Sequence, residues 1–276
     1  MAASFPIASG WQTTKLNSIK EVFSTLTFLE KEIWISRGHS KCIGKLVPKF
    51  DREPFSKIVD RNSKLKLEIE TIRLFQETAF PVASVDEQKA MSSDMTTLMV
   101  LQHYGVPTRL LDWSLSPYVS AFFAVDDDES LDGELWCLHY DTYMSRTSEQ
   151  WAQYPQIPAN TPIESIYEMV FDQKIPNPDF FVCVFDYLSH HRIDAQQGLF
   201  SLTGSFGKDH AKSIRTLFAN NTSNFHRYII KSNLKKAIKQ KLYDDYEIWL
   251  GSLFPDTPGI AEALKSIQLR DARLLI

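Results

Sequence analysis

LMVLQHYGVPTRLLDWSLSPYVSAFFA, residues 98–124, combines apolar and polar side chains more densely than any other stretch of this sequence. Gly105 permits backbone angles that are closed to other residues, and Pro107 fixes its own φ, so the stretch predicts a rigid bend between two apolar elements. Binding residues are often held on such bends. We therefore expect a binding site built from the polar and amphipathic residues between the apolar ends, which are Gln102, His103, Tyr104, Arg109, Asp112 and Trp113.

The bend leads into a predicted helix. Ser116 is a favourable N-cap and Pro117 suits the first helical position. This helix should bury Val119, Phe122 and Phe123.

The bulk composition is that of an ordinary globular protein. The chain has 276 residues, of which 43% are hydrophobic and 23% charged, and we expect a single domain over residues 1–276. The net charge of −4 gives no global attraction for nucleic acid, so such binding would need a local basic patch. The three cysteines lack paired metal spacing and are expected to be reduced, buried apolar residues. No signal peptide or membrane-length apolar run is apparent, so we expect a cytoplasmic protein without membrane contact.

Hydrophobic periodicity predicts a mixture of helices and strands, which is an α+β fold. Residues 16–31 form an amphipathic helix, with Asn17 or Ser18 as its cap. The helix at 64–77 is expected to face solvent, with Glu68 and Glu70 solvated. Further helices are predicted over about 86–101, 163–171, 232–246 and the closing SLFPDTPGIAEALK, and strands over 32–40, 134–140, 180–185, 199–202 and 225–230.

Two further groups of residues carry chemistry. Arg37 and Gly38 end the strand at 32–40, where a guanidinium can hold an anion while glycine lets a ligand approach; a salt-bridged surface arginine is the alternative. His139 has no partner at metal-ligand spacing, so no metal site is predicted. Before the strand at 199–202 lies a polar cluster that comprises Arg192, Asp194, Gln196, Gln197 and Gly198.

One basic cluster lies on the helix at 232–246 and just before it. It is either a solvated helix face or a contact for a phosphate backbone. Its members are Lys231, Lys235, Lys236, Lys239 and Lys241.

Three stretches, in this order, resemble the FRG family, which is named for an aromatic-Arg-Gly motif. The first is IWISRGHS, with Ser36 where the family usually has an aromatic residue, and the second is LQHYGVPTRLLDWSLSPYVSAFFA. The third is RIDAQQGLF, together with the closing SLFPD. The resemblance spans roughly residues 30 to 265.

The resemblance implies an ADP-ribosyltransferase-like fold, a split mixed β-sheet with flanking helices. It implies NAD as substrate, no metal, and one residue from each of three strands at the dinucleotide. These would be Arg37, the central block, and Gln196 or Gln197. It also implies a toxin of a toxin–antitoxin or anti-phage system, with RNA or DNA favoured over protein as acceptor and a possible antitoxin or chaperone partner.

Each residue has a role under this resemblance. Arg37 and Arg109 would hold phosphate or ribose oxygens, and Gln197 would hydrogen-bond a ribose hydroxyl. His103 or Asp112 would deprotonate the acceptor, although an ion pair of Asp112 with Arg109 that braces the bend is the competing role. Tyr104 or Trp113 would stack on nicotinamide, and the remaining cofactor contacts would come from Gly38, Gln102 and Thr108.

The sequence lacks the glutamate expected at the third position, where glutamine cannot act as a base. This departure favours a second hypothesis, a non-catalytic module that binds a nucleotide or a partner in the same pocket.

Overall fold

A computed structural model describes residues 10–127, 129–151, 161–162, 165, 180–185, 191–219 and 221–274. Nearly all of the helix predicted at 163–171 lies outside these described residues.

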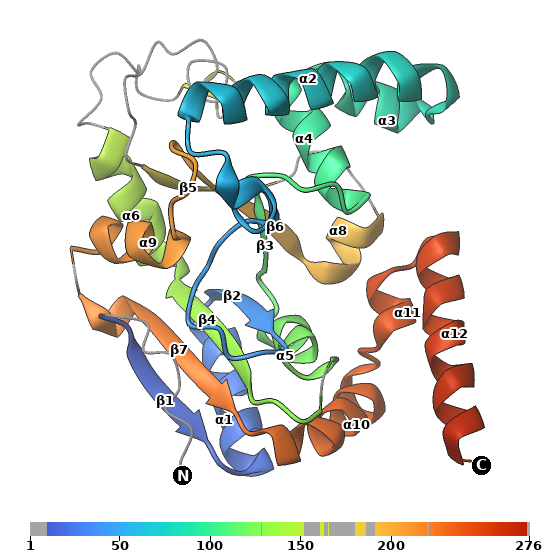
Figure 1. The fold of residues 1–276 in the computed structure, drawn as a ribbon. Coiled ribbons are helices and arrows are strands. Elements are labelled where there is room, and N and C mark those ends of the chain that lie inside the picture. Colours follow the sequence, from blue (N-terminus) through green and yellow to red (C-terminus); the bar gives the residue numbers. More distant parts are fainter. Residues whose placement is uncertain are drawn as a thin grey trace.

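A seven-stranded mixed sheet forms the centre of the described part of the chain (Figure 1). The strand order is β1-β7-β4-β2-β3-β6-β5, in which β1 and β7 are parallel and all other neighbours are antiparallel. The strands are β1 (Gln12–Leu16), β2 (Trp34–His39), β3 (Leu111–Ser114), β4 (Gly133–His139), β5 (Phe181–Phe185), β6 (Gly198–Thr203) and β7 (Phe225–Ile230).

The two halves of this sheet are joined at a single point. Between β2 and β3 only Ser36 and Ser114 pair, whereas β2 and β4 pair over six successive positions. The sheet is therefore divided into β1-β7-β4-β2 and β3-β6-β5, and Arg37 follows directly after the joining residue.

Helices flank the sheet on both faces (Figure 1). Those up to residue 151 are α1 (Ile19–Lys31), α2 (Arg61–Ala79), α3 (Val85–Ala90), α4 (Asp94–His103), α5 (Pro117–Val125) and α6 (Tyr140–Trp151). The later ones are α8 (His191–Gln196), α9 (His210–Leu217), α10 (Lys235–Tyr246), α11 (Leu250–Leu253) and α12 (Thr257–Leu274). Short 3-10 turns are η1 (Lys49–Asp51), η2 (Phe55–Lys57), η3 (Phe80–Val82), η4 (Thr222–Asn224) and η5 (Ser232–Leu234).

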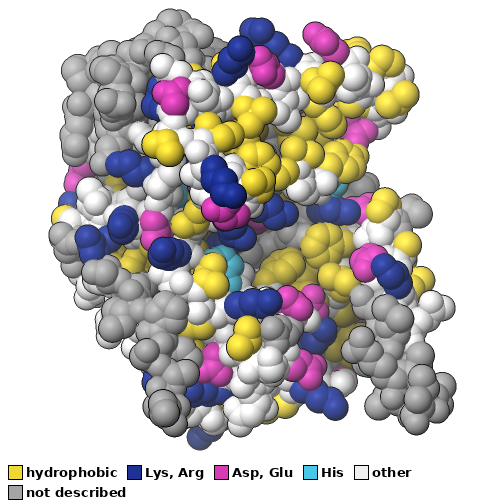
Figure 2. All heavy atoms as spheres, viewed as in Figure 1, with side chains coloured by type: hydrophobic (Ala, Val, Ile, Leu, Met, Phe, Trp, Pro, Cys, Tyr) yellow, Lys and Arg dark blue, Asp and Glu magenta, His cyan; other side chains and the backbone are white. Residues whose placement is uncertain are grey.

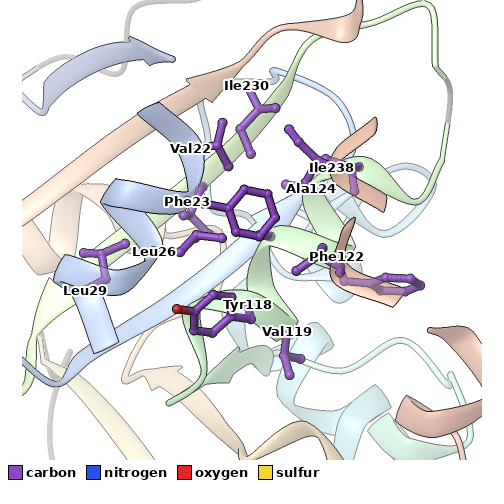
Figure 3. Close-up of a cluster of buried hydrophobic side chains, with 14 of the residues drawn as sticks. Val22, Phe23, Leu26, Leu29, Tyr118, Val119, Phe122, Ala124, Ile230 and Ile238 are labelled. Carbon is purple, nitrogen blue, oxygen red and sulfur yellow. The ribbon is translucent and has the colours of Figure 1, made fainter. Parts of the chain in front are cut away.

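The first core lies between β2, β4 and the helices α1, α5 and α10 (Figure 3). The caps predicted for two of these helices are confirmed, since Ser18 accepts from the amide of Glu21 and Ser116 from that of Val119. Full burial of each large apolar side chain contributes about 1.5–3 kcal/mol. The α1 and α5 side chains that meet in Figure 3 include Val22, Phe23, Leu26, Tyr118 and Phe122.

Two further cores cover the rest of the sheet. On the opposite face Trp11, Trp113 and Trp136 pack with residues of α6 and α9. In the β3-β6-β5 half of the sheet, α2 and α4 pack against β5 and β6. Because both faces are covered, β4 is buried along nearly its whole length.

Three local predictions need correction. The helix predicted at 86–101 is two helices, because Ser84 caps α3 in a capping box with Glu87 and Ser93 caps α4 separately. Strand β1, mostly exposed, strand β3, within the predicted bend, and helices α8 and α9 were not predicted. Cys137 and Cys183 are buried as expected, but Cys42 is half-buried and its Sγ accepts from Arg227 at 2.9 Å.

No helix in the described residues combines the length and the apolar character needed to cross a bilayer.

Candidate active site

A large cleft opens where the two halves of the sheet meet. Its volume is about 1270 Å³, and the space-filling view shows a hollow near the centre of the molecule with basic side chains around it (Figure 2). Thr108, Arg109 and Gln197 do not line the cleft. The predicted site residues that do line it are Arg37, Gly38, Gln102, His103, Tyr104, Asp112, Trp113 and Gln196.

Arg37 lies at the junction of the two sheet halves. Its Nη1 donates to the backbone carbonyl of Asp112 and lies 3.4 Å from the Asp112 carboxylate. Burial lowers the pKa of the Arg37 guanidinium, and the nearby Asp112 opposes that shift. Arg37 therefore forms an ion pair, as in the salt-bridge alternative, and it also lines the cleft, where the binding of an anion stays a prediction.

Asp112 connects Arg37 to the central bend. The Nε2 of Gln102 donates to both carboxylate oxygens, at 3.1 and 2.9 Å, and Thr108 Oγ1 donates to Gln102 Oε1 at 2.6 Å. The Asp112 side chain is nevertheless 52% exposed. Its carboxylate is thus held in one orientation while it stays open to a ligand.

Arg109 has a different partner from the one considered from the sequence. It does not pair with Asp112; its Nε donates to Glu68 Oε1 at 2.9 Å and its Nη2 to Glu68 Oε2. Its guanidinium lies 3.7 Å from the ring centre of Phe206. Arg109 is 3% exposed and outside the cleft, so it fastens the bend to α2 instead of contacting a ligand there.

Glu68 was predicted to be solvated, and this was wrong. It is 3% exposed, on the same face of α2 as the buried Leu65 and Ile72. These three residues are spaced by three and four positions, which places them on one stripe of a helix. That spacing was the available signal that Glu68 points inward.

A buried polar network behind Arg37 was missed by sequence reasoning. Arg37 Nε donates to His39 Nε2 at 3.1 Å, and His39 Nδ1 lies 2.9 Å from Glu134 Oε1. Glu134 is fully buried and accepts from Arg227 Nε at 2.9 Å. The one sequence signal was a glutamate at the start of an otherwise apolar strand.

The charges in this network are set by burial and pairing. Burial lowers the pKa of His39, which favours a neutral imidazole that donates through Nδ1 and accepts at Nε2. Burial alone would raise the pKa of Glu134, but His39 and Arg227 hold it below its usual value. The network therefore fixes the orientation of Arg37 from behind.

Gly38 has a packing role that the sequence did not indicate. A Cβ at this position would lie 1.9 Å from the carbonyl oxygen of Ser120 and 2.7 Å from the amide nitrogen of Ala124. Glycine is required here so that α5 can approach β2, whereas the approach of a ligand stays a prediction. Ser36, beside it, donates to Ser120 Oγ at 2.9 Å across the same interface.

A comparison with protein families finds a match that runs from just before β2 to the first residue of β4. Residues 32–133 match the FRG domain. The resemblance predicted from the motifs is confirmed for this stretch, whereas RIDAQQGLF and SLFPD lie beyond the matched residues. No curated protein and no solved structure matches the chain.

The aromatic residues of the FRG region differ in accessibility. Tyr104 is 56% exposed and donates its hydroxyl to Glu87, a bond that raises the Tyr104 pKa to about 12. The ring of His103 packs edge-on against Tyr104 at 5.0 Å between centres. Trp113 is 3% exposed and donates to Ser201 Oγ at 2.7 Å, so it forms part of the wall while Tyr104 is accessible for stacking.

The two glutamines after the FRG region are not on a strand, contrary to the prediction. Gln196 is the last residue of α8, and Gln197 has a φ of 46° in the left-handed region before β6 begins. Gln196 lines the cleft and donates to the carbonyl of Leu253 at 2.9 Å. Gln197 is exposed and lies outside the cleft. The start of β6 therefore presents no glutamine to a ligand in the cleft.

Arg192 links the later stretches to the FRG region. It pairs with Asp256 through two nitrogens, and its Nη1 donates to the carbonyl of His103 at 3.1 Å. This pairing lowers the pKa of Asp256 to about 2. One arginine thus joins RIDAQQGLF, SLFPD and the central bend at the edge of the cleft.

The basic cluster on and beside α10 is largely neutralised. Lys235 is buried and donates to the carbonyls of Ser40 and Asp127, and Lys231, Lys239 and Lys241 each pair with an aspartate. The connection between α5 and β4 supplies Asp126 and Asp132 for these pairs. The interpretation of this cluster as a continuous phosphate contact is therefore not supported.

His139, set aside as a metal ligand, lies with its Nδ1 3.0 Å from Thr142 Oγ1 at the start of α6. Within the described residues, no group of three His, Cys, Asp or Glu side chains is arranged to hold a metal ion.

Proposed function

We propose that the protein is an NAD-dependent ADP-ribosyltransferase whose active site is the cleft between the two sheet halves. The observation that carries this proposal is the place of Arg37, beside the single residue pair that joins the halves and directed toward Asp112 in the cleft. A guanidinium binds phosphate through two parallel hydrogen bonds, which suits the diphosphate of a dinucleotide. The volume of the cleft, about 1270 Å³, exceeds the roughly 300–1,000 Å³ of ordinary ligand pockets, which suits a ligand as large as a dinucleotide.

In the proposed reaction the bond between ribose C1′ and the nicotinamide nitrogen breaks. Its electron pair stays on nicotinamide, which loses its positive charge, and C1′ becomes oxocarbenium-like. Such a state needs positioning and electrostatic stabilisation more than it needs a strong nucleophile. The acceptor atom then bonds to C1′ and gives up its proton.

We assign the carboxylate role to Asp112, in place of the glutamine proposed from the sequence. Its oxygens are oriented by Gln102 and lie beside Arg37, yet the side chain stays 52% exposed. It would accept a hydrogen bond from a ribose hydroxyl, stabilise positive charge at C1′ and receive the acceptor proton. His103 is less suited to this role because its ring packs against Tyr104. A toxin or anti-phage role stays a prediction from the family resemblance.

A non-catalytic nucleotide-binding module is the second candidate. The contacts of Gln196 favour this candidate. Of the two predicted glutamines only Gln196 lines the cleft, and its amide donates to the Leu253 carbonyl and not toward the cleft.

The test uses NAD labelled in its adenylate phosphate, incubated with the purified protein and a cell extract later separated into RNA, DNA and protein. Arg37→Gln is the test variant, and Arg146→Gln on α6, outside the cleft, is the matched control. Label transferred by the wild type and the control, but not by Arg37→Gln, supports the transferase. Intact NAD and no label with folded wild-type protein would leave the binding module.

A further inference from the structure

We propose that the segment of residues 41–52, at the rim of the cleft, binds the phosphates of a single-stranded nucleic acid. The role of this strand as the acceptor of ADP-ribose rests on the proposed function. The binding of the strand to the protein does not. Hereafter residues 41–52 are called the cationic segment.

The charge of the cationic segment is almost entirely positive. It holds Lys41, Lys45, Lys49 and Arg52, all exposed, and of these all but Lys45 line the cleft. Its one acidic residue, Asp51, is buried and pairs with Lys64 at 2.5 Å. In a chain with a net charge of −4, this is a local basic surface of the kind that polyanion binding requires.

The cationic segment is also held rigidly, although most of it is irregular. The amides of Ile43 and Gly44 donate to the buried Glu134, at 3.3 and 3.2 Å. The amide of Leu46 donates to Asp209 at 2.9 Å, and that of Phe50 to the Thr108 carbonyl at 3.2 Å. Preorganised cations lose less conformational entropy when they bind a ligand than cations on a mobile loop.

The cleft beside these cations offers surfaces for bases. Tyr104 is 56% exposed, and the partly buried Phe123 and Phe254 also line the cleft. A positive groove combined with accessible aromatic rings is how many proteins bind single strands, because every base has a face that can stack. A duplex keeps its bases paired and stacked, so its bases cannot reach these rings.

Acidic residues limit where the backbone of such a strand can run. The cleft is also lined by carboxylates from other elements, on α3, on β3, after α5 and before α12; these are Asp86, Glu87, Asp112, Asp127 and Asp256. Because Asp112 and Asp256 are paired with Arg37 and Arg192, and Asp86 with Lys89, phosphates are disfavoured mainly beside Glu87 and Asp127. The cationic segment is therefore the side over which a polyanion would enter.

The test is fluorescence anisotropy with a labelled single strand of about 12 nucleotides, as DNA and as RNA, without NAD. The test variant is Lys41→Gln/Lys49→Gln/Arg52→Gln. The control variant, Lys20→Gln/Lys236→Gln/Arg146→Gln, removes the same charge from residues outside the cleft. All proteins are first shown to melt cooperatively at similar temperatures.

The wild type and the control should bind, and the test variant should bind about tenfold more weakly at ~50 mM salt. Its slope of log affinity against log salt should be shallower by about 2, since each phosphate contact on a single strand contributes roughly 0.7. A duplex of the same sequence should bind more weakly than the single strand.

The proposal is overturned if the wild type does not bind, if the control loses as much affinity as the test variant, or if the duplex binds equally well. It is also overturned if saturating NAD displaces the strand, because the cations would then serve the NAD diphosphate. Binding without transfer of label would contradict the proposed function alone.

Discussion

Two arginine–carboxylate pairs on either side of the central bend differ in their access to solvent. The side chains of Arg109 and Glu68 are 4% and 3% exposed, whereas those of Arg37 and Asp112 are 15% and 52% exposed. A buried pair needs both partners, because either one alone is an uncompensated charge in a medium of low polarity. An accessible pair has hydrogen-bonding capacity left for a ligand. The same residue types therefore serve stability in one place and binding in the other.

The largest effect should come from breaking the buried pair. Arg109→Met leaves Glu68 without its main partner and also removes the contact with Phe206, so we expect a loss of about 3–5 kcal/mol in the free energy of unfolding. Urea denaturation monitored by tryptophan fluorescence measures it.

Asp112→Asn is the control for this comparison. An exposed pair contributes only about 0–1 kcal/mol, so the Asn variant should unfold close to the wild type. Equal losses in the two variants would contradict the distinction between the pairs.

Gly38→Ala should cause the next largest effect, on stability and not only on ligand binding. The new Cβ would clash with the backbone of α5, for which we expect about 1–3 kcal/mol or more. Gly198→Ala is the matched control, since Gly198 also lines the cleft but its nearest neighbour to a Cβ would be at 3.5 Å. If both variants melted like the wild type, the packing role of Gly38 would be refuted.

Acidification should lower the free energy of unfolding through the buried histidines. Burial lowers the pKa of His210 to about 3 and also lowers that of His39, whereas in the unfolded chain both lie near 6.5. Below about pH 6.5 the unfolded chain therefore binds more protons than the folded one, and stability falls as the pH falls toward 3. Urea denaturation between pH 7 and pH 5 should show this loss, and His210→Gln should make its pH dependence shallower. An unchanged slope in that variant would contradict the assignment.

The last variant removes the support that His39 gives to Arg37. His39→Leu removes the hydrogen bonds of His39 to Arg37 and to the buried Glu134, for which we expect a loss of about 1–3 kcal/mol in the free energy of unfolding. It should also lower nicotinamide release roughly tenfold or more, because Arg37 is no longer held in place. His39→Gln, which keeps polar atoms, should recover part of the activity. A stability loss without any change in activity would show that the network is only structural.

The sequence predicted elements well where burial has a regular period. The helices at residues 16–31 and after Ser116, and the strands at 134–140, 180–185 and 225–230, were found because apolar spacing and caps are local features. Strand β1 was missed because it is mostly exposed, and helices α8 and α9 because both are short and largely polar. Strand β3 was missed because its four residues lie within the predicted bend. The order of the strands has no local signal, so the single pair between β2 and β3 could not be predicted.

The site was predicted in composition but not in pairing. Arg37, Gln102, His103, Tyr104 and Gln196 do line one cleft. The partners were out of reach because they are far apart in the chain: Glu68 lies 41 residues from Arg109, and Glu134 lies 95 residues from His39. The ion pairs of the basic cluster on and beside α10 were out of reach for the same reason, since Lys231 pairs with Asp132 99 residues away.

The most direct test of the central claim is calorimetric titration of NAD into the wild type, Arg37→Gln and Asp112→Asn, with melting temperatures recorded for each. The wild type should bind NAD, and Arg37→Gln should bind at least about tenfold more weakly, as expected for the loss of a charge-assisted contact, while its melting temperature stays close to that of the wild type. No binding by the folded wild type, or equal affinity in Arg37→Gln, would contradict the claim that the accessible pair is the functional one.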